Sequence, residues 1–156
     1  MCLTGTLLRT VLLVLLVSKT DGKHRCNYKE ILGSYTGVIF VELQNLNLTD
    51  TCNTSRERDL CPSKKVHGIL LSIFDIAHRT RCQTTGKQQL NLAKPLYNME
   101  HLIIQNCNPK FLRTKAPCSS IKRIQRENRK KKKLIRITTA LITCWQKLQT
   151  LFTGYK

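Results

Sequence analysis

The chain has few glycines and few acidic residues for its length. Seven glycines occur in 156 residues, and none belongs to a glycine-rich phosphate-binding loop, which argues against a nucleotide-binding enzyme. The nine Asp and Glu residues are thinly spread and offer no paired carboxylates for glycoside hydrolysis. No Cys-x-x-Cys or His-Glu-x-x-His segment occurs. The sequence therefore predicts no catalytic residues, no metal site and no cofactor, and we expect a protein that is not an enzyme.

Basic residues and cysteines are abundant. Lys and Arg number 27, which gives a net charge of +18, and there are eight cysteines. The hydrophobic fraction of 41% is enough to build a core, and the length suits one small domain.

The first 22 residues have the pattern of a secretory signal peptide. Arg9 precedes the apolar run 11–17, and small or polar residues follow as far as Gly22. The apolar run is far shorter than the ~20 residues that span a bilayer, and no later segment has 18 apolar residues in a row. We predict that residues 23–156 are secreted into the extracellular space and do not insert into a membrane.

Secretion changes how the cysteines are interpreted. Seven cysteines remain after residue 22, and an oxidising compartment favours disulfides, with the odd cysteine either free or bridged to a second chain. Two glycosylation sequons, at Asn47 and Asn53, flank Cys52 and indicate an exposed glycosylated loop.

Four segments carry apolar residues at the spacing of one helix face. They cover residues 28–46, 64–81, 88–106 and 134–152. Gly33 and Gly37 weaken the first segment, where the run 38–41 could instead start a strand, and Pro95 makes the third segment less regular. Residues 47–63 and the basic linker 108–133 are long connections. We therefore predict an all-α, disulfide-linked four-helix bundle in which long crossover loops allow the up-up-down-down topology.

Four short stretches carry a resemblance to a known family. They are Gly22-Lys23 with Tyr28-Lys-Glu-Ile-Leu32, Thr85-Gly-Lys-Gln-Gln-Leu-Asn-Leu92, Ile103-Ile-Gln-Asn-Cys107 and Thr143-Cys-Trp-Gln-Lys-Leu148. They resemble the interleukin-7 and thymic stromal lymphopoietin family of short-chain four-helix cytokines, and interleukin-7 most closely. The basic run Arg129–Lys133 resembles the linker of thymic stromal lymphopoietin, which pairs its cysteines differently and has a small local loop comparable to Cys52–Cys61.

The resemblance to interleukin-7 implies three nested disulfides and leaves Cys82 as the extra cysteine. The implied pairs are Cys26–Cys144, Cys52–Cys118 and Cys61–Cys107.

The resemblance also implies a function in immune signalling. A monomeric cytokine would assemble an interleukin-7-receptor-alpha-like chain with the common gamma chain and promote lymphocyte growth, survival and development. Trp145 is either a core residue or an interface anchor on the last helix. The expected face for the alpha chain comprises Ile31, Ser34, Tyr35, Leu90 and Lys94, and that for the gamma chain comprises Trp145, Lys147 and Gln149.

The basic run has three interpretations. It is a solvated mobile loop, a site for sulfated glycans such as heparan sulfate, or a protease-processing site. The second interpretation makes the chain a basic secreted glycan-binding or host-defence protein. The residues concerned are Arg129, Lys130, Lys131, Lys132 and Lys133.

Two further classes are disfavoured. Nucleic-acid binding is not expected, because no aromatic residues interleave with the charges. A secretory ribonuclease is not expected, because its Cys-Lys-x-x-Asn-Thr-Phe segment is missing. We expect the four histidines His24, His67, His78 and His101 to lie on the surface or on helix rims.

Overall fold

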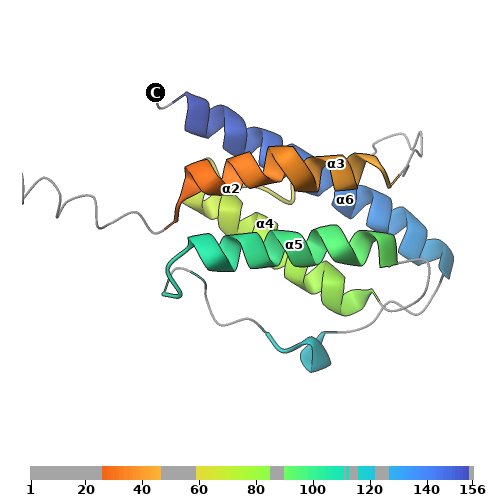
Figure 1. Ribbon diagram of the computed structural model, residues 1–156. Coiled ribbons are helices and arrows are strands. Elements are labelled where there is room, and N and C mark those ends of the chain that lie inside the picture. The colour runs from red at the N-terminus through yellow and green to blue at the C-terminus, as the bar shows by residue number, and fades with distance from the viewer. Residues whose placement is uncertain are drawn as a thin grey trace, which may run out of the picture.

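The computed structural model describes residues 26–46, 59–84, 90–110, 112, 116–121 and 127–154 (Figure 1). The predicted signal peptide, the sequons at Asn47 and Asn53, and Cys52 lie outside these residues.

The described residues form four helical rods. The first is continuous through α2 (Tyr28–Ser34), the π-helical segment η2 (Tyr35–Ile39) and α3 (Phe40–Gln44). The others are α4 (Val66–Gln83), α5 (Leu90–Asn106) and α6 (Glu127–Thr153), with a short 3₁₀ turn, η4 (Cys118–Ser120), before α6. The only β pairing among the described residues is an isolated bridge between Cys26 and Cys107. The prediction of an all-α protein is confirmed, and the strand alternative for residues 38–41 is wrong.

The first rod begins at an asparagine cap. The side chain of Asn27 accepts a hydrogen bond from the backbone N–H of Glu30 at 3.3 Å, and the acid of Glu30 lies in the positive first turn. This cap starts the helix immediately after Cys26, and it therefore fixes where the rod begins relative to that cysteine.

A π turn keeps the first rod in register with the core. Ile31, Tyr35, Ile39 and Leu43 are buried at steps of four residues. Such steps overshoot the 3.6-residue turn of an α-helix. The wider π turn, in which the backbone N–H of Phe40 donates to the carbonyl of Tyr35, offsets that drift. All four side chains consequently face the interior.

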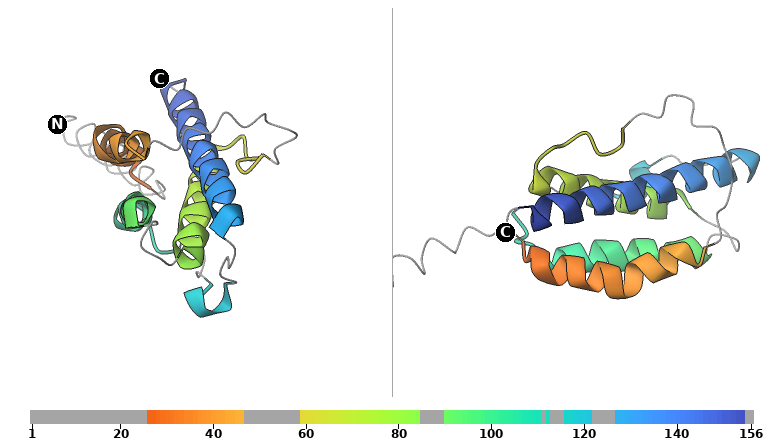
Figure 2. Two further views of the ribbon diagram at one scale, coloured as in Figure 1. Left: turned by 90° about the vertical axis from the view of Figure 1, so that its right-hand side faces the viewer. Right: turned by 90° about the horizontal axis from the view of Figure 1, so that it is seen from above.

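The rods lie in two antiparallel pairs (Figure 2). The first rod pairs with α5, because Cys26 at its start is bonded to Cys107 and Glu42 near its end meets Lys94 near the start of α5, at 3.0 Å. In the same way α4 pairs with α6, because Gln83 in the last turn of α4 accepts a hydrogen bond from Lys133 early in α6, at 3.0 Å.

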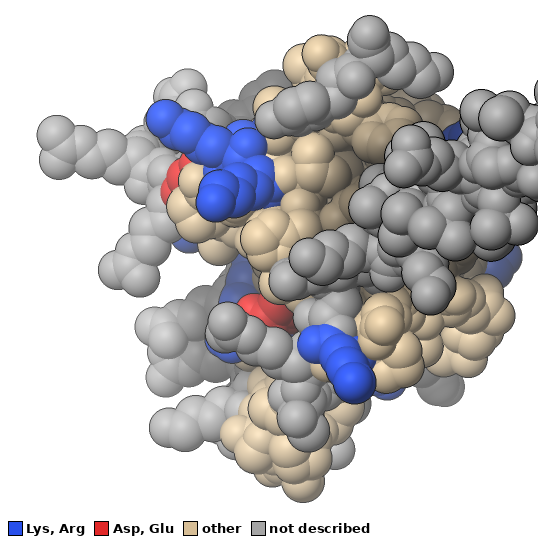
Figure 3. Space-filling model, turned by 90° about the vertical axis from the view of Figure 1, so that its left-hand side faces the viewer, with Lys and Arg blue, Asp and Glu red and all other residues tan. Residues whose placement is uncertain are grey.

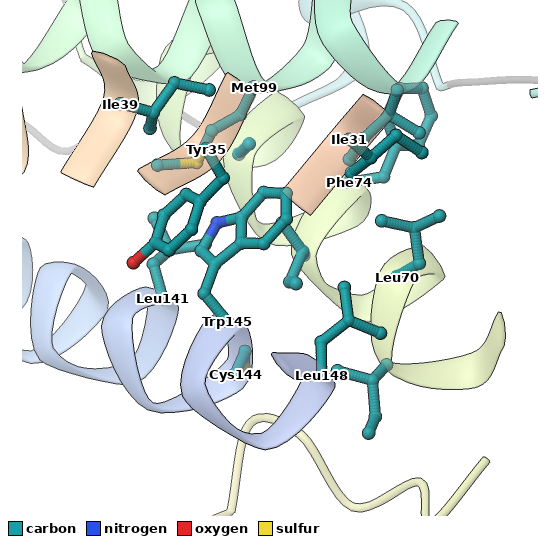
Figure 4. Packing of buried hydrophobic residues seen from close by; sticks show 14 of the residues in the cluster. Ile31, Tyr35, Ile39, Leu70, Phe74, Met99, Leu141, Cys144, Trp145 and Leu148 are labelled. Atoms are coloured by element: carbon teal, nitrogen blue, oxygen red, sulfur yellow. The ribbon is translucent and has the colours of Figure 1, made fainter. Parts of the chain in front are cut away.

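Trp145 occupies the centre of the core between these pairs (Figure 4). The indole is fully buried and stacks on the Tyr35 ring of the first rod, with centroids 4.1 Å apart and planes at 10°. Residues from each rod surround the two rings, and they include Ile31, Ile39, Leu70, Phe74, Met99, Leu141 and Leu148.

The disulfide pairs differ from those implied by the family resemblance. Cys26 is not bonded to Cys144, because the first rod starts where α5 ends; the structure pairs Cys26 with Cys107. Cys144 faces the segment before α4 and is bonded to Cys61. The implied pair Cys61–Cys107 is therefore also absent. The nested arrangement is therefore wrong.

Cys82 is likewise not the extra cysteine. It lies in the last turn of α4 and is bonded to Cys118, which is thereby unavailable to Cys52. The three described bridges use six cysteines, and Cys52 belongs to none of them.

The end of the basic linker is also helical. The last helix was expected to begin near Leu134, but α6 begins at Glu127 and includes the run Arg129–Lys133. Lys and Arg are good helix formers, and this segment contains neither proline nor glycine to stop the helix.

Candidate functional site

The predicted alpha-chain face divides between the core and the surface. Ile31 and Tyr35 are buried, at 0% and 1% exposure, so they do not lie on a surface that a receptor reaches. Ser34 is half-buried, and Lys94 is exposed. The side chain of Leu90 lies outside the described residues. Residues 31 and 35 are four apart and share one face of the helix, and that face is the apolar one that packs into the core.

The predicted gamma-chain face does not include Trp145 at the surface. Trp145 is a core residue in this structure, so the anchor interpretation is wrong. Lys147 is half-buried, and its ammonium donates to the carbonyl oxygen of Cys61 at 2.7 Å. Gln149 is half-buried on the same helix. The lysine consequently fastens α6 to the segment before α4.

Three large apolar side chains are exposed where the first rod meets α5. Val38, Val41 and Tyr97 are 53%, 47% and 56% exposed. The Glu42 carboxylate, beside Val41, joins the two helices through the Lys94 ammonium, and it also accepts a hydrogen bond from Asn98 at 3.0 Å. Contiguous apolar surface on a protein marks a candidate site for binding another protein, so these three side chains are candidate contact residues.

This surface lies on the same two helices as the predicted alpha-chain face, but sequence reasoning did not single out Val38, Val41 or Tyr97. Val38 and Val41 were placed in an apolar run that could have been a strand. Val38 lies seven residues after Ile31, which in a regular α-helix is the same face, so the sequence offered no signal that the π turn would leave Val38 exposed.

A buried polar cluster links α4 to α5. The Glu100 carboxylate is 3% exposed and accepts hydrogen bonds from Arg81 at 2.6 Å and from His78 Nδ1 at 3.1 Å. Its hydrogen bond and charge raise the pKa of the Arg81 guanidinium above its ordinary value. Arg81 therefore gives the Glu100 carboxylate a charged partner in a position where an unpaired carboxylate would be costly.

His78 joins this cluster to the segment before η4. Its Nδ1 faces the Glu100 carboxylate, and its Nε2 faces the carbonyl oxygen of Ala116 at 2.9 Å. Both partners offer acceptor oxygens, so the ring is held between a carboxylate on one side and a backbone carbonyl on the other. The prediction that His78 lies at the surface is wrong, because the side chain is 9% exposed; His67 and His101 are exposed as expected.

The bridge Cys82–Cys118 lies directly beside His78. The Sγ of Cys82 is 3.8 Å from His78 Nε2, and the three potential ligand atoms of His78, Cys82 and Cys118 all lie within 4.8 Å of one another. Because the two sulfurs are bonded to each other, neither offers a thiolate to a metal ion in this state.

A hollow of about 800 Å³ opens between α4 and the segment 116–121. Its lining combines the apolar side chains of Leu71, Phe74 and Ile121 with His78 and Arg79. The Arg79 guanidinium donates to Asp75 at 3.0 Å, so these two charges are already paired.

The basic run projects from the first turns of α6. Lys131, Lys132, Lys133 and Arg136 are exposed there, whereas the side chains of Arg129 and Lys130 lie outside the described residues. The opposite end of the bundle, where α6 ends, carries blue side chains separated by tan surface (Figure 3). Four exposed basic side chains thus lie within two turns of one another near the start of α6.

None of the helices in the described part of the chain is long and apolar enough to cross a membrane.

Comparison with protein-family models, with curated proteins and with solved structures finds no match to this chain.

Proposed function

We propose that the chain is a secreted, glycosylated cytokine of the interleukin-7 type that assembles two receptor chains. The observation that carries the proposal is the exposed apolar surface formed by Val38, Val41 and Tyr97, where the first rod meets α5. A small disulfide-linked helical bundle that presents such a surface is suited to binding another protein.

The up-up-down-down topology is part of this proposal. It is supported by the pairing of the first rod with α5 and of α4 with α6, each antiparallel. A further contact agrees with it, because Tyr28 at the start of the first rod lies against Phe152 at the end of α6, with ring centroids 6.0 Å apart. The first rod thus runs antiparallel to α6 as well as to α5.

The interleukin-7-receptor-alpha-like chain would bind at the first rod and α5. Val38, Val41 and Tyr97 replace Ile31 and Tyr35 as the contact residues, and Lys94 lies beside them. The common gamma chain would bind the outer face of α6, where Thr143, Gln146 and Thr150 are exposed, next to Gln149.

The test measures binding of the intact secreted chain to the alpha-receptor ectodomain by surface plasmon resonance. Val41→Asp is expected to weaken binding about tenfold or more, because an apolar side chain that becomes buried in the complex contributes about 1.4 kcal/mol or more to the binding free energy. Thr139→Asp is the matched control, because it adds the same charge at an exposed position on α6. Equal affinities for Val41→Asp, Thr139→Asp and the wild-type chain would refute the proposed surface.

Secretion and glycosylation have a separate test. Expression of the full chain in animal cells is expected to release a product that begins after Gly22 and loses mass on treatment with an N-glycosidase. A chain retained inside the cell with residues 1–22 intact would contradict this part of the proposal.

Binding of sulfated glycans is a second candidate function, favoured by the exposed lysines along the first turns of α6. Lysines near a helix N-terminus repel one another and oppose the helix dipole. A polyanion would relieve both effects. Its binding would also weaken as salt is added.

Neutralisation of Lys131, Lys132 and Lys133 to Gln tests this candidate by elution from immobilised heparin. We expect elution at a clearly lower salt concentration than for a control in which Lys29, Lys64 and Lys65, all exposed, are changed to Gln. Both variants lose three positive charges, so equal elution would show that net charge alone, and not a site on α6, is responsible.

A further inference from the structure

The cluster at the end of α4 has the residue types and spacing of a zinc site. His78 and Cys82 are four residues apart on one helix, so their side chains lie on the same face. Cys118 approaches from η4, and the three ligand atoms lie within 4.8 Å of one another. Tetrahedral zinc with two sulfur ligands and one nitrogen ligand needs ligand separations of about 3.5–3.8 Å. The 3.8 Å between His78 Nε2 and Cys82 Sγ meets that need.

The surroundings of His78 match those of a metal-binding histidine. Zinc-bound histidines usually donate their other ring N–H to a carboxylate, which orients the ring. Here Nδ1 donates to Glu100, which Arg81 holds in place through a second hydrogen bond. The nitrogen that remains, Nε2, is the one nearest the sulfurs.

The Cys82–Cys118 bridge is open to reduction. Cys118 lies on an exposed turn, whereas the four cysteines of the other two bridges are 1–7% exposed. A thiolate from an external dithiol can attack the Cys118 sulfur, and Cys82 leaves as a thiolate 3.8 Å from Nε2 of His78. The second thiol of the reagent then displaces Cys118. The dithiol becomes a cyclic disulfide, and the protein gains two electrons and two protons as two cysteine thiols.

We propose that reduction of the Cys82–Cys118 bridge converts this cluster into a zinc site, in which Cys82, Cys118 and Nε2 of His78 are ligands and a water molecule completes the tetrahedron. Zinc binding releases the two thiol protons, and Nε2 binds the ion in its unprotonated form. The sulfurs separate from bonding distance to about 3.8 Å. The carbonyl of Ala116 leaves Nε2 at the same time, because it precedes Cys118 by two residues and moves with that turn.

The disulfide and the metal therefore exclude each other. An oxidising environment closes the bridge and removes both thiolates, whereas a reducing environment with zinc keeps segment 116–121 attached to α4 through the metal. Glu100 acts here as a positioning residue, since it touches His78 and not the ion.

The experiment uses the full chain with Cys52→Ser, which removes a cysteine that belongs to none of the described bridges. Limited dithiothreitol is applied, peptide mapping identifies the opened bridge, and the reductant is removed without oxygen. Cobalt(II) is then added as a spectroscopic probe, followed by zinc. We expect one ion per chain, thiolate-to-cobalt charge transfer and tetrahedral cobalt bands that zinc abolishes.

Two variants and the unreduced protein distinguish a three-ligand metal site from two free thiols. His78→Asn keeps both thiols and is expected to lose the three-ligand cobalt spectrum. Glu100→Gln is expected to weaken zinc binding about 10–100-fold while the spectrum stays tetrahedral. The unreduced protein is expected to bind no ion. Reduced, folded protein that binds no cobalt, or that gives the same spectrum and affinity with His78→Asn, would overturn the proposal.

A further variant avoids reduction altogether. In the Cys52→Ser background, Cys118→His cannot form the bridge to Cys82 and leaves one cysteine and two histidines at the same positions. We expect this protein to bind zinc with all other bridges intact. Absence of zinc binding by the folded variant would refute the geometry even if dithiothreitol opens more than one bridge.

Discussion

Tyr35 and Trp145 stack face to face in the centre of the bundle, with centroids 4.1 Å apart and planes at 10°. One ring comes from the π turn of the first rod and the other from α6, so the contact joins the two helical pairs. Large aromatic rings contribute much of the apolar area in a core. The stack is therefore a main contact between the two layers of this fold.

Trp145→Ala is expected to destabilise the protein by about 3–5 kcal/mol, because it removes a fully buried indole and leaves a cavity. Trp145→Phe is expected to cost less, because a ring still faces Tyr35. Urea denaturation followed by circular dichroism measures both changes. A loss below about 1 kcal/mol for Trp145→Ala would contradict the central position of the ring.

Tyr35→Phe is expected to leave stability unchanged or to increase it. The Tyr35 hydroxyl is buried and has no hydrogen-bond partner among the described residues, so removing it removes a desolvation cost of about 1–3 kcal/mol. Denaturant titration at neutral pH compares the variant with the wild-type chain, and a clear loss of stability would show that the hydroxyl has a partner.

The same substitution is expected to change the alkaline limit of stability. Burial raises the pKa of the Tyr35 phenol above its ordinary value of 10.0. Below that value the phenol is neutral in both the folded and the unfolded chain. Above it the unfolded chain loses the proton first, so stability falls as the pH rises. Tyr35→Phe should lessen this fall between pH ~10 and ~11, and thermal melts across that range measure the difference.

Glu100→Ala is expected to destabilise the protein by about 3–5 kcal/mol, because it leaves the Arg81 charge without its buried partner and removes the contact of His78 Nδ1. Asp75→Ala is the matched control. It also breaks a carboxylate–arginine pair on α4, with Arg79, but that pair is exposed and the loss should stay below about 1 kcal/mol. Similar losses for the two variants in denaturant titrations would argue against the buried cluster.

Gly33→Ala is expected to stabilise the protein by about 0.5–1 kcal/mol, because glycine weakens a helix interior and a methyl group at this position meets nothing within 4 Å. Gly68→Ala is the control in α4, where an added methyl group collides with the Ser63 side chain. The midpoint of thermal unfolding should rise for Gly33→Ala and rise less or fall for Gly68→Ala. A larger rise in the midpoint for Gly68→Ala than for Gly33→Ala would contradict the space assigned around these two glycines.

Helix positions could be predicted from the sequence because apolar spacing reports directly on burial. The segment 64–81 was predicted from its apolar stripe, and α4 covers Val66–Gln83. Helix faces were less predictable where spacing departed from 3.6. The π turn between Tyr35 and Ile39 rotates the surface of the first rod, and no local propensity specifies where such a turn occurs.

The disulfide pairing and the polar cluster could not be predicted from local patterns. Cys26 meets Cys107, 81 residues away, only because the first rod and α5 are antiparallel neighbours. Likewise, His78 and Glu100 have ordinary surface residue types and become a buried pair only when α4 packs on α5. Both features are properties of the assembled bundle.

The positions of the cysteines along the chain set the order in which the three described bridges can close during synthesis. The Cys26–Cys107 bond can close once the ribosome has completed α5, whereas Cys61 must wait until Cys144 has emerged with the final helix. Cys82 meets its partner between these two events. A nascent chain truncated before α6 would thus retain an unpaired Cys61 thiol that folding enzymes could recognise and hold back.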